Sequence, residues 1–164
     1  MIKELNKIES LFIKNYGQKI TNLTIENECD EYFGFNFQIE KLNFKFRKSK
    51  ITPKKVGQFV TLWKRNSEKQ TEPFNENDNF DFFIFVSEQD EKFGFFIFSK
   101  KLLIEKNILS SRLKEGKRGF RLYPTWVKTE SKQAEKTQSW QTEYFINLTN
   151  NEQNDIEKLK SILN

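Results

Sequence analysis

The sequence predicts a single α/β domain with a central mixed β-sheet flanked by helices. Three observations lead to this prediction. Apolar residues at helical spacing mark both ends of the 164-residue chain, two-residue alternation marks its middle, and two strongly apolar runs lie between turn sequences. A chain of this length normally builds one core, so residues 1–164 are assigned to one domain. The 18 phenylalanines are the expected core material.

The chain opens with a helix and a hairpin. Apolar residues at helical spacing predict an amphipathic helix over residues 2–16, and Gly17 ends it. Two-residue alternation then predicts strands over 33–39 and 42–46, joined by a two-residue turn at 40–41.

The sheet continues after an interruption at Thr52-Pro53. Alternation resumes over residues 57–64, and the acid-rich stretch 66–79 is expected to be a loop. Residues 80–86 and 93–98 are nearly continuous apolar runs around a turn. Because strands that are apolar on both faces need cover on both sides, we expect these two at the centre of the sheet.

The remaining elements are mostly helical. Ser99 is expected to cap a short helix that ends at Lys106, and Ser131 to cap a helix over 131–145. A short strand is predicted over 120–123, and a last amphipathic helix over 152–163. This order of elements is typical of a mixed α/β domain.

The residue types that are missing exclude many kinds of active site. The chain has no histidine, which excludes histidine-based nucleophile pairs, histidine general bases and histidine-ligated metals. Its single cysteine, Cys29, excludes an intramolecular disulfide and suits a reducing compartment; we expect it to be buried. No apolar stretch approaches the roughly 20 residues of a membrane span, and the first residues are too acidic and polar for a secretory signal, so we expect none. The sequence therefore predicts a cytoplasmic protein without membrane contact.

Positive and negative residues are segregated along the chain. Residues 41–65, the first basic block, hold nine Lys and Arg and no acid. Residues 66–91 carry a local charge of −7, and residues 92–140, the second basic block, return to +8. A solvated surface that is merely basic is one interpretation. The other is a surface that binds the phosphates of DNA or RNA, which requires that the two blocks meet in space.

Cations and aromatic residues together form the strongest candidate binding site. Lys132, Lys136 and Trp140 recur every four residues and should share one face of a helix. Trp126 or Trp140 is expected to stack on bases, whereas core packing is favoured for Trp63 and Tyr123. The expected phosphate contacts are Arg47, Lys48, Lys50, Lys54, Lys55, Lys64, Arg65, Lys117, Arg118 and Arg121.

A metal-dependent nuclease or phosphodiesterase is the alternative that the available residue types permit. Such an enzyme holds Mg²⁺ with an acid on one strand and an Asp/Glu-x-Lys triplet on the next. Asp78 and Asp81 are the acids to test, but every such triplet in the chain falls in an expected turn. The hairpin also places the start of strand 80–86 beside Phe98 rather than beside an acid. We therefore rank cleavage below binding.

Several long segments of the chain share one resemblance. They are Ile51–Asn66, Pro73–Phe83, Gly116–Trp126 and Lys132–Trp140. Together they resemble the MepB family of bacteria over roughly residues 32–147. It implies a cytosolic bacterial protein with a core similar to the restriction-endonuclease-like fold, for which nucleic-acid binding is proposed. A shared fold does not by itself imply a shared activity.

The predicted function is binding of DNA or RNA through phosphate contacts, without clear sequence specificity. Besides the nuclease, the alternative is a binding protein for a small anionic ligand held by the basic surface. No cofactor is expected, and Mg²⁺ enters only with the nuclease alternative.

Overall fold

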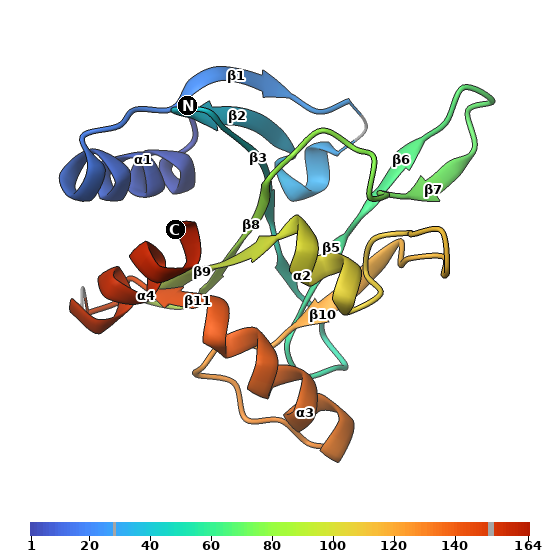
Figure 1. The fold of residues 1–164 in the computed structure, drawn as a ribbon. Coiled ribbons are helices and arrows are strands. Elements are labelled where there is room, and N and C mark those ends of the chain that lie inside the picture. The colour runs from blue at the N-terminus through green and yellow to red at the C-terminus, as the bar shows by residue number, and fades with distance from the viewer. Residues whose placement is uncertain (28, 151–152) are drawn as a thin grey trace.

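The protein is built around a six-stranded mixed sheet. The computed structural model describes residues 1–27, 29–150 and 153–164. The strands of the sheet are Thr21–Ile25 (β1), Phe35–Ile39 (β2), Leu42–Lys48 (β3), Phe82–Gln89 (β8), Lys92–Ser99 (β9) and Phe145–Asn147 (β11). Their order is β1-β2-β3-β8-β9-β11, and β3 and β8 run parallel while the other neighbours are antiparallel (Figure 1). The predicted mixed sheet flanked by helices is confirmed.

Different elements cover the two faces of this sheet. Helices Lys3–Tyr16 (α1) and Gln153–Leu163 (α4) pack on one face. On the other face lies a small three-stranded sheet of Lys50–Ile51 (β4), Gln58–Thr61 (β5) and Gly119–Leu122 (β10), with helices Lys100–Glu105 (α2) and Lys132–Gln141 (α3). A hairpin of Trp63–Arg65 (β6) and Thr71–Pro73 (β7) projects beside the small sheet (Figure 1).

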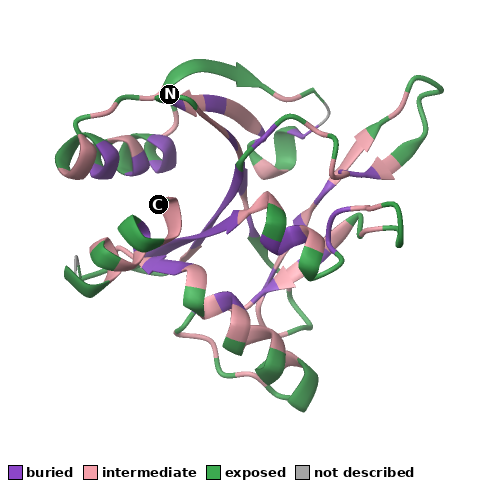
Figure 2. Cartoon of the chain, in the orientation of Figure 1, coloured by how far each residue is buried: buried purple, intermediate pink, exposed green. Residues whose placement is uncertain are grey.

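Phenylalanine fills both layers between these elements. Fifteen of the 18 phenylalanine side chains are buried, which confirms the predicted core. Figure 2 shows the buried residues concentrated along β3, β8 and β9 and the exposed ones on the outer turns of the helices and at the hairpin. Phe59, in β5, is one of the three phenylalanines outside the buried set.

The predicted helix caps, the end of the first helix and the first two-residue turn are confirmed. Ser99 and Ser131 cap α2 and α3, and each hydroxyl accepts a backbone N–H bond of 3.1 Å. Gly17 ends α1 with a left-handed φ of 67°. Glu40 takes a φ of 54° in the two-residue turn between β2 and β3.

Two predicted elements are divided in the structure. The strand expected over 57–64 is split into β5, which pairs with β4 and β10, and β6, which pairs with β7 inside the predicted acidic loop. The helix expected over 131–145 ends at Gln141, because a 3₁₀ turn at Thr142–Tyr144 delivers Phe145 to β11. β1 and β4 were not predicted, since both are short edge strands whose residues are exposed.

Among the described residues, no helix has both the length and the apolar character that crossing a membrane would demand.

Candidate nucleic-acid interface

The two basic blocks meet in the small sheet. β5 belongs to the first block and β10 to the second, and they pair antiparallel with Phe59 opposite Arg121. On the other side of β5, Lys50 of β4 also lies opposite Phe59. Because directly paired residues of adjacent strands point to the same face, Lys50, Phe59 and Arg121 form a row across one face of the small sheet. We call this face the outer face.

Burial shows which way the outer face points. Gln58, Val60 and Leu122 alternate with the residues of the row and are at most 1% exposed, because they face the six-stranded sheet. Phe59 and Arg121 are half-buried and face away from it. The outer face is therefore a solvent-facing surface of the molecule.

Two glycines let aromatic rings lie across the outer face. A Cβ on Gly119 would come within 2.6 Å of Cζ of Phe59, so the ring extends over the backbone of β10. Gly57 has a φ of 86°, and a Cβ there would lie 2.7 Å from Cδ1 of Tyr123. Only glycine leaves room for these two contacts. The rings of Phe59 and Tyr123 are consequently held against the sheet, and the Arg121 guanidinium lies over the Phe59 ring, with Cζ 5.9 Å from the ring centroid.

Cations border these rings. Lys54 and Lys55 are exposed in the loop between β4 and β5, and in the described part of the chain neither contacts an acid. The Arg121 guanidinium donates to the Val56 carbonyl at 3.4 Å and to the Thr52 hydroxyl, which fastens this loop to β10. Lys50 is 3.5 Å from Glu31, but both side chains are largely exposed, so the pairing is weak.

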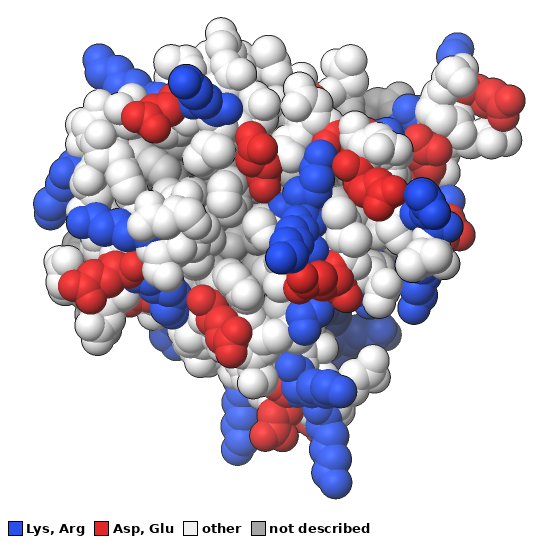
Figure 3. Space-filling view, viewed as in Figure 1, with Lys and Arg blue, Asp and Glu red and all other residues white. Residues whose placement is uncertain are grey.

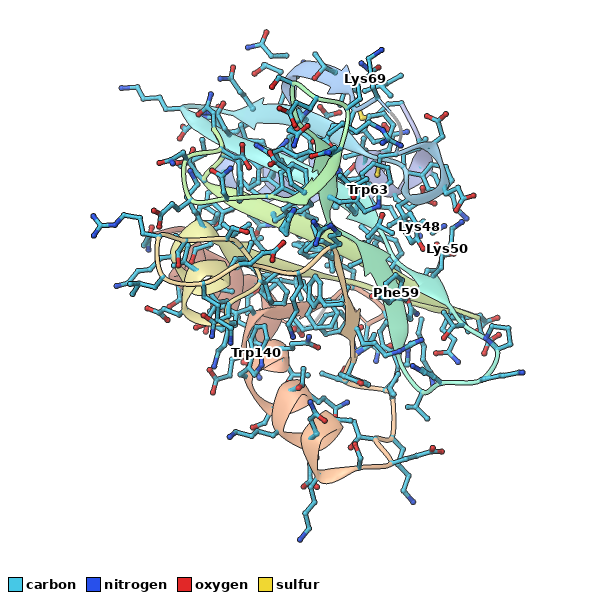
Figure 4. All side chains as sticks on the ribbon, turned by 90° about the vertical axis from the view of Figure 1, so that its right-hand side faces the viewer. Lys48, Lys50, Phe59, Trp63, Lys69 and Trp140 are labelled. Carbon is cyan, nitrogen blue, oxygen red and sulfur yellow. The ribbon has the colours of Figure 1, made fainter. Side chains whose placement is uncertain are left out.

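The cationic surface continues from β10 to the hairpin. Lys117 and Arg118 lie at the start of β10 and are exposed. Arg118 donates to the Thr71 carbonyl of β7 at 3.1 Å, and its guanidinium also lies 3.2 Å from the Glu115 carboxylate. In the hairpin, Arg65 lies over the Trp63 ring, with Cζ 5.3 Å from the ring centroid. In Figure 4 the labelled residues run downward from Lys69 through Trp63, Lys48 and Lys50 to Phe59.

The structure excludes one of the predicted phosphate contacts, Arg47, and pairs two others, Lys48 and Lys64, with acids. Arg47 is 1% exposed and binds the Glu26 carboxylate, so it cannot reach a phosphate. Lys48 lies on the α1 side of the sheet, 3.4 Å from Glu4 and 3.5 Å from Glu88. Lys64 contacts Asp78 at 2.6 Å and Glu72 at 3.5 Å. In each case an acid from another segment neutralises the cation.

The candidates on α3 form a separate patch. Lys132, Lys136 and Trp140 share a face, as predicted, and line a shallow hollow that also holds Glu135 and Glu143. Figure 3 shows cations and acids interspersed on this side of the molecule, including the tip formed by α3.

The predicted stacking residues pack against the core instead. The Trp140 ring lies 5.3 Å from the Phe98 ring, and Lys106 lies over it at 5.0 Å. Trp126 packs edge-on against Phe145, and its indole N–H donates to Gln89 at 3.2 Å. Both rings are half-buried.

The two candidate catalytic acids have structural partners. Asp78 accepts from the backbone N–H of Asn75 at 2.7 Å besides its contact with Lys64. Asp81 accepts from the backbone N–H of Asn43 at 2.7 Å. The hairpin register places Phe83 opposite Phe98, so the start of the predicted strand 80–86 does not lie beside Phe98 as expected. Within the described ranges, no group of three or more acids or cysteines could hold a metal ion.

Cys29 is a free, buried thiol, as predicted. Burial raises the pKa of this thiol, against the opposing effect of the Arg47 guanidinium. It is accordingly poorly suited to act as a nucleophile.

The outer-face rings were not among the residues predicted to stack. Phe59 and Tyr123 lie in segments where residues of two faces alternate, as in any half-buried strand. This alternation does not show which of the two faces the rest of the protein covers. The signal that could have identified them is the pair of glycines, because Gly57 and Gly119 face aromatic residues across the same strand pair.

The chain is similar to proteins of one family. The MepB-like family model matches residues 26–147. The crystal structure of MepB has 31% sequence identity and a TM-score of 0.80, over 93% of this chain and all of that one. A bacterial homing endonuclease has 19% identity and a TM-score of 0.46, over 79% of this chain and 76% of that one. No curated protein sequence matches the chain.

The family model covers every strand of the six-stranded sheet except β1, and all of the small sheet and the hairpin. The family-model match and the 31% identity to MepB over 93% of this chain both show that the chain belongs to the MepB-like family.

Proposed function

We propose that this protein binds DNA or RNA on the outer face of the small sheet, through phosphate contacts and without clear sequence specificity. The observation that supports the proposal is the pairing of β5 with β10, which joins the two basic blocks in one surface. Lysine and arginine bind phosphates by displacing condensed counterions, and this contribution is independent of sequence.

The dimensions of the outer face suit a polymer. The row from Lys50 through Phe59 to Arg121 crosses three strands and so spans about 10 Å. One strand of nucleic acid rises about 3.4 Å per nucleotide, so this distance corresponds to about three nucleotides. Six cations border the face: Lys50, Lys54, Lys55, Lys117, Arg118 and Arg121. Contact of all six with a single strand corresponds to a slope of about −4 in a plot of log affinity against log salt.

Fluorescence anisotropy with labelled DNA and RNA strands of about 16 nucleotides tests the proposal. We expect binding at about 50 mM salt that weakens by more than a hundredfold at about 200 mM. Absence of binding at low salt, or an affinity that salt does not change, would contradict it. The same samples with Mg²⁺ report any cleavage, and stabilisation by mononucleotides or phosphate but not by oligonucleotides would favour a small anionic ligand instead.

A further inference from the structure

One leucine of the chain projects into solvent at the edge of the cationic surface. Leu113 lies in the loop that joins α2 to β10, and its exposed fraction of 93% is the largest among the large apolar residues that the structure describes. Its neighbours Arg112 and Lys114 are exposed as well. A single exposed apolar side chain is common on protein surfaces. What sets Leu113 apart is the loop that carries it and the surface beside it.

Hydrogen bonds hold the tip of this loop in one conformation. The backbone N–H of Ser111 donates to the Lys114 carbonyl at 2.9 Å, and the Ser111 hydroxyl accepts from the backbone N–H of Leu113 at 3.3 Å. Both bonds close within four residues and turn the chain around Leu113. Because this turn is already fixed, little conformational entropy is lost when a ligand covers the leucine.

The base of the loop is fastened to the rest of the protein. The Ser110 hydroxyl accepts from the backbone N–H of Gly116 at 2.8 Å, and the backbone N–H of Ser110 donates to the Phe74 carbonyl at 2.8 Å. A Cβ on Gly116 would lie 2.3 Å from the Ile108 carbonyl oxygen, so only glycine lets the two arms of the loop approach so closely. The loop therefore presents Leu113 from a rigid support.

The loop adjoins the outer face through the start of β10. Lys117 and Arg118 follow it directly, and the Arg118 guanidinium lies 3.2 Å from the Glu115 carboxylate at the end of the loop. The Phe59 ring lies over Gly119, the first residue of β10. Figure 1 shows the loop on the same side of the molecule as the β6–β7 hairpin, to which Arg118 also donates. Nucleic acid on the outer face therefore reaches the loop at this end of β10.

The charges of the loop fit a polyanion. Residues 112–118 hold one acid, Glu115, and four cations: Arg112, Lys114, Lys117 and Arg118. All five side chains are exposed. An apolar tip between cations matches nucleic acid, whose phosphates alternate with the apolar faces of its bases. An anionic membrane would offer similar contacts, but the loop continues the surface that we propose binds nucleic acid.

We propose that Leu113 inserts between two neighbouring bases of the bound DNA or RNA and unstacks them, while Arg112 and Lys114 contact the phosphates on either side. The inference rests on the proposed function. Apolar side chains, leucine among them, act in this way in proteins that kink DNA. Insertion removes the apolar surface of the leucine from water, and this gain offsets part of the cost of separating the two bases.

A strand that carries the fluorescent base 2-aminopurine at several internal positions tests the inference, because stacking on neighbouring bases quenches this base. We expect the fluorescence of the strand to rise when saturating wild-type protein binds. The rise should disappear in Leu113→Ser and persist in Leu113→Met, which keeps an apolar side chain. The affinity of Leu113→Ser, measured by anisotropy, should fall by about tenfold at most, because the phosphate contacts remain.

Ile13→Ser is the matched control for the leucine. Ile13 is 42% exposed on α1, on the opposite face of the six-stranded sheet, so its replacement should leave both the fluorescence and the affinity unchanged. The Lys50→Gln/Lys54→Gln/Lys55→Gln variant should bind more weakly but show the same rise once the strand is saturated. Because Leu113 is almost fully exposed, neither replacement at this position should disturb folding.

The outcomes separate this inference from the proposed function. Binding by the wild-type protein without a rise in fluorescence, or a rise that Leu113→Ser retains, overturns the insertion and leaves phosphate binding intact. Failure to bind any strand overturns the proposed function as well. Vesicles of phosphatidylglycerol and phosphatidylcholine form the last arm. If the wild-type protein binds them, Leu113→Ser does not, and the fluorescence of the strand is the same with both proteins, the leucine contacts lipid and the inference is wrong.

Discussion

Replacing Lys50, Lys54 and Lys55 by glutamine is expected to weaken binding of a single strand by about a hundredfold at about 50 mM salt. These three lysines border Phe59 on the outer face, and Lys54 and Lys55 are exposed without acid partners among the described residues. The loss comes from the counterions that the three charges no longer displace. The slope of log affinity against log salt should become shallower by about 2.

A second triple variant with the same change in net charge serves as the control. Lys14, Lys19 and Lys160 are exposed, and Lys14 and Lys160 lie on α1 and α4, which cover the opposite face of the six-stranded sheet. Their replacement by glutamine should change affinity by no more than about threefold, through long-range charge alone. Equal losses in the two variants would mean that binding responds to net charge and not to the outer face.

Replacing Glu26 by glutamine is expected to lower the free energy of unfolding by about 3–5 kcal/mol. Its carboxylate binds both Arg47 and Lys45, and the Arg47 side chain is 1% exposed. Glutamine leaves that buried guanidinium without a counter-charge. Since domains of this kind are typically stable by about 5–15 kcal/mol, the midpoint of urea unfolding should fall clearly.

Two further variants show whether the buried charge is the cause. Glu31→Gln also removes an acid near a lysine, but Glu31 is 80% exposed, so we expect a change within about 0.5 kcal/mol. Adding Arg47→Met to Glu26→Gln removes the buried cation as well and should recover part of the lost stability. If the urea midpoints of Glu26→Gln and Glu31→Gln coincide, the buried pair does not stabilise the fold.

Much of the fold could be predicted because local chemistry determines it. Ser99 and Ser131 cap their helices, and alternation from residue 33 to residue 46 indicates the first hairpin, because these signals act within a few residues. The division of residues 57–64 could not be predicted. It depends on which partner each half finds: β10, from a distant part of the sequence, for one half, and β7, the second arm of the hairpin, for the other.

The candidate site could be predicted in outline from the distribution of charge along the chain. The two basic blocks are visible in the sequence, and β5 and β10 bring them together. The sequence does not show that Glu26 would bury Arg47, or that Asp78 would pair with Lys64, because these contacts join separate segments. It likewise does not show that Trp126 and Trp140 would pack inward while Phe59 stays on the outer face.

The most direct test is a lysine-acetylation footprint, read by mass spectrometry, of the protein with and without a saturating single strand at low salt. The outer-face proposal predicts that Lys50, Lys54, Lys55 and Lys117 lose most of their reactivity when the strand binds, while Lys14, Lys19 and Lys160 keep theirs. Protection of Lys14, Lys19 and Lys160, with the outer-face lysines still reactive, would place the nucleic acid on the other side of the protein and contradict the proposal.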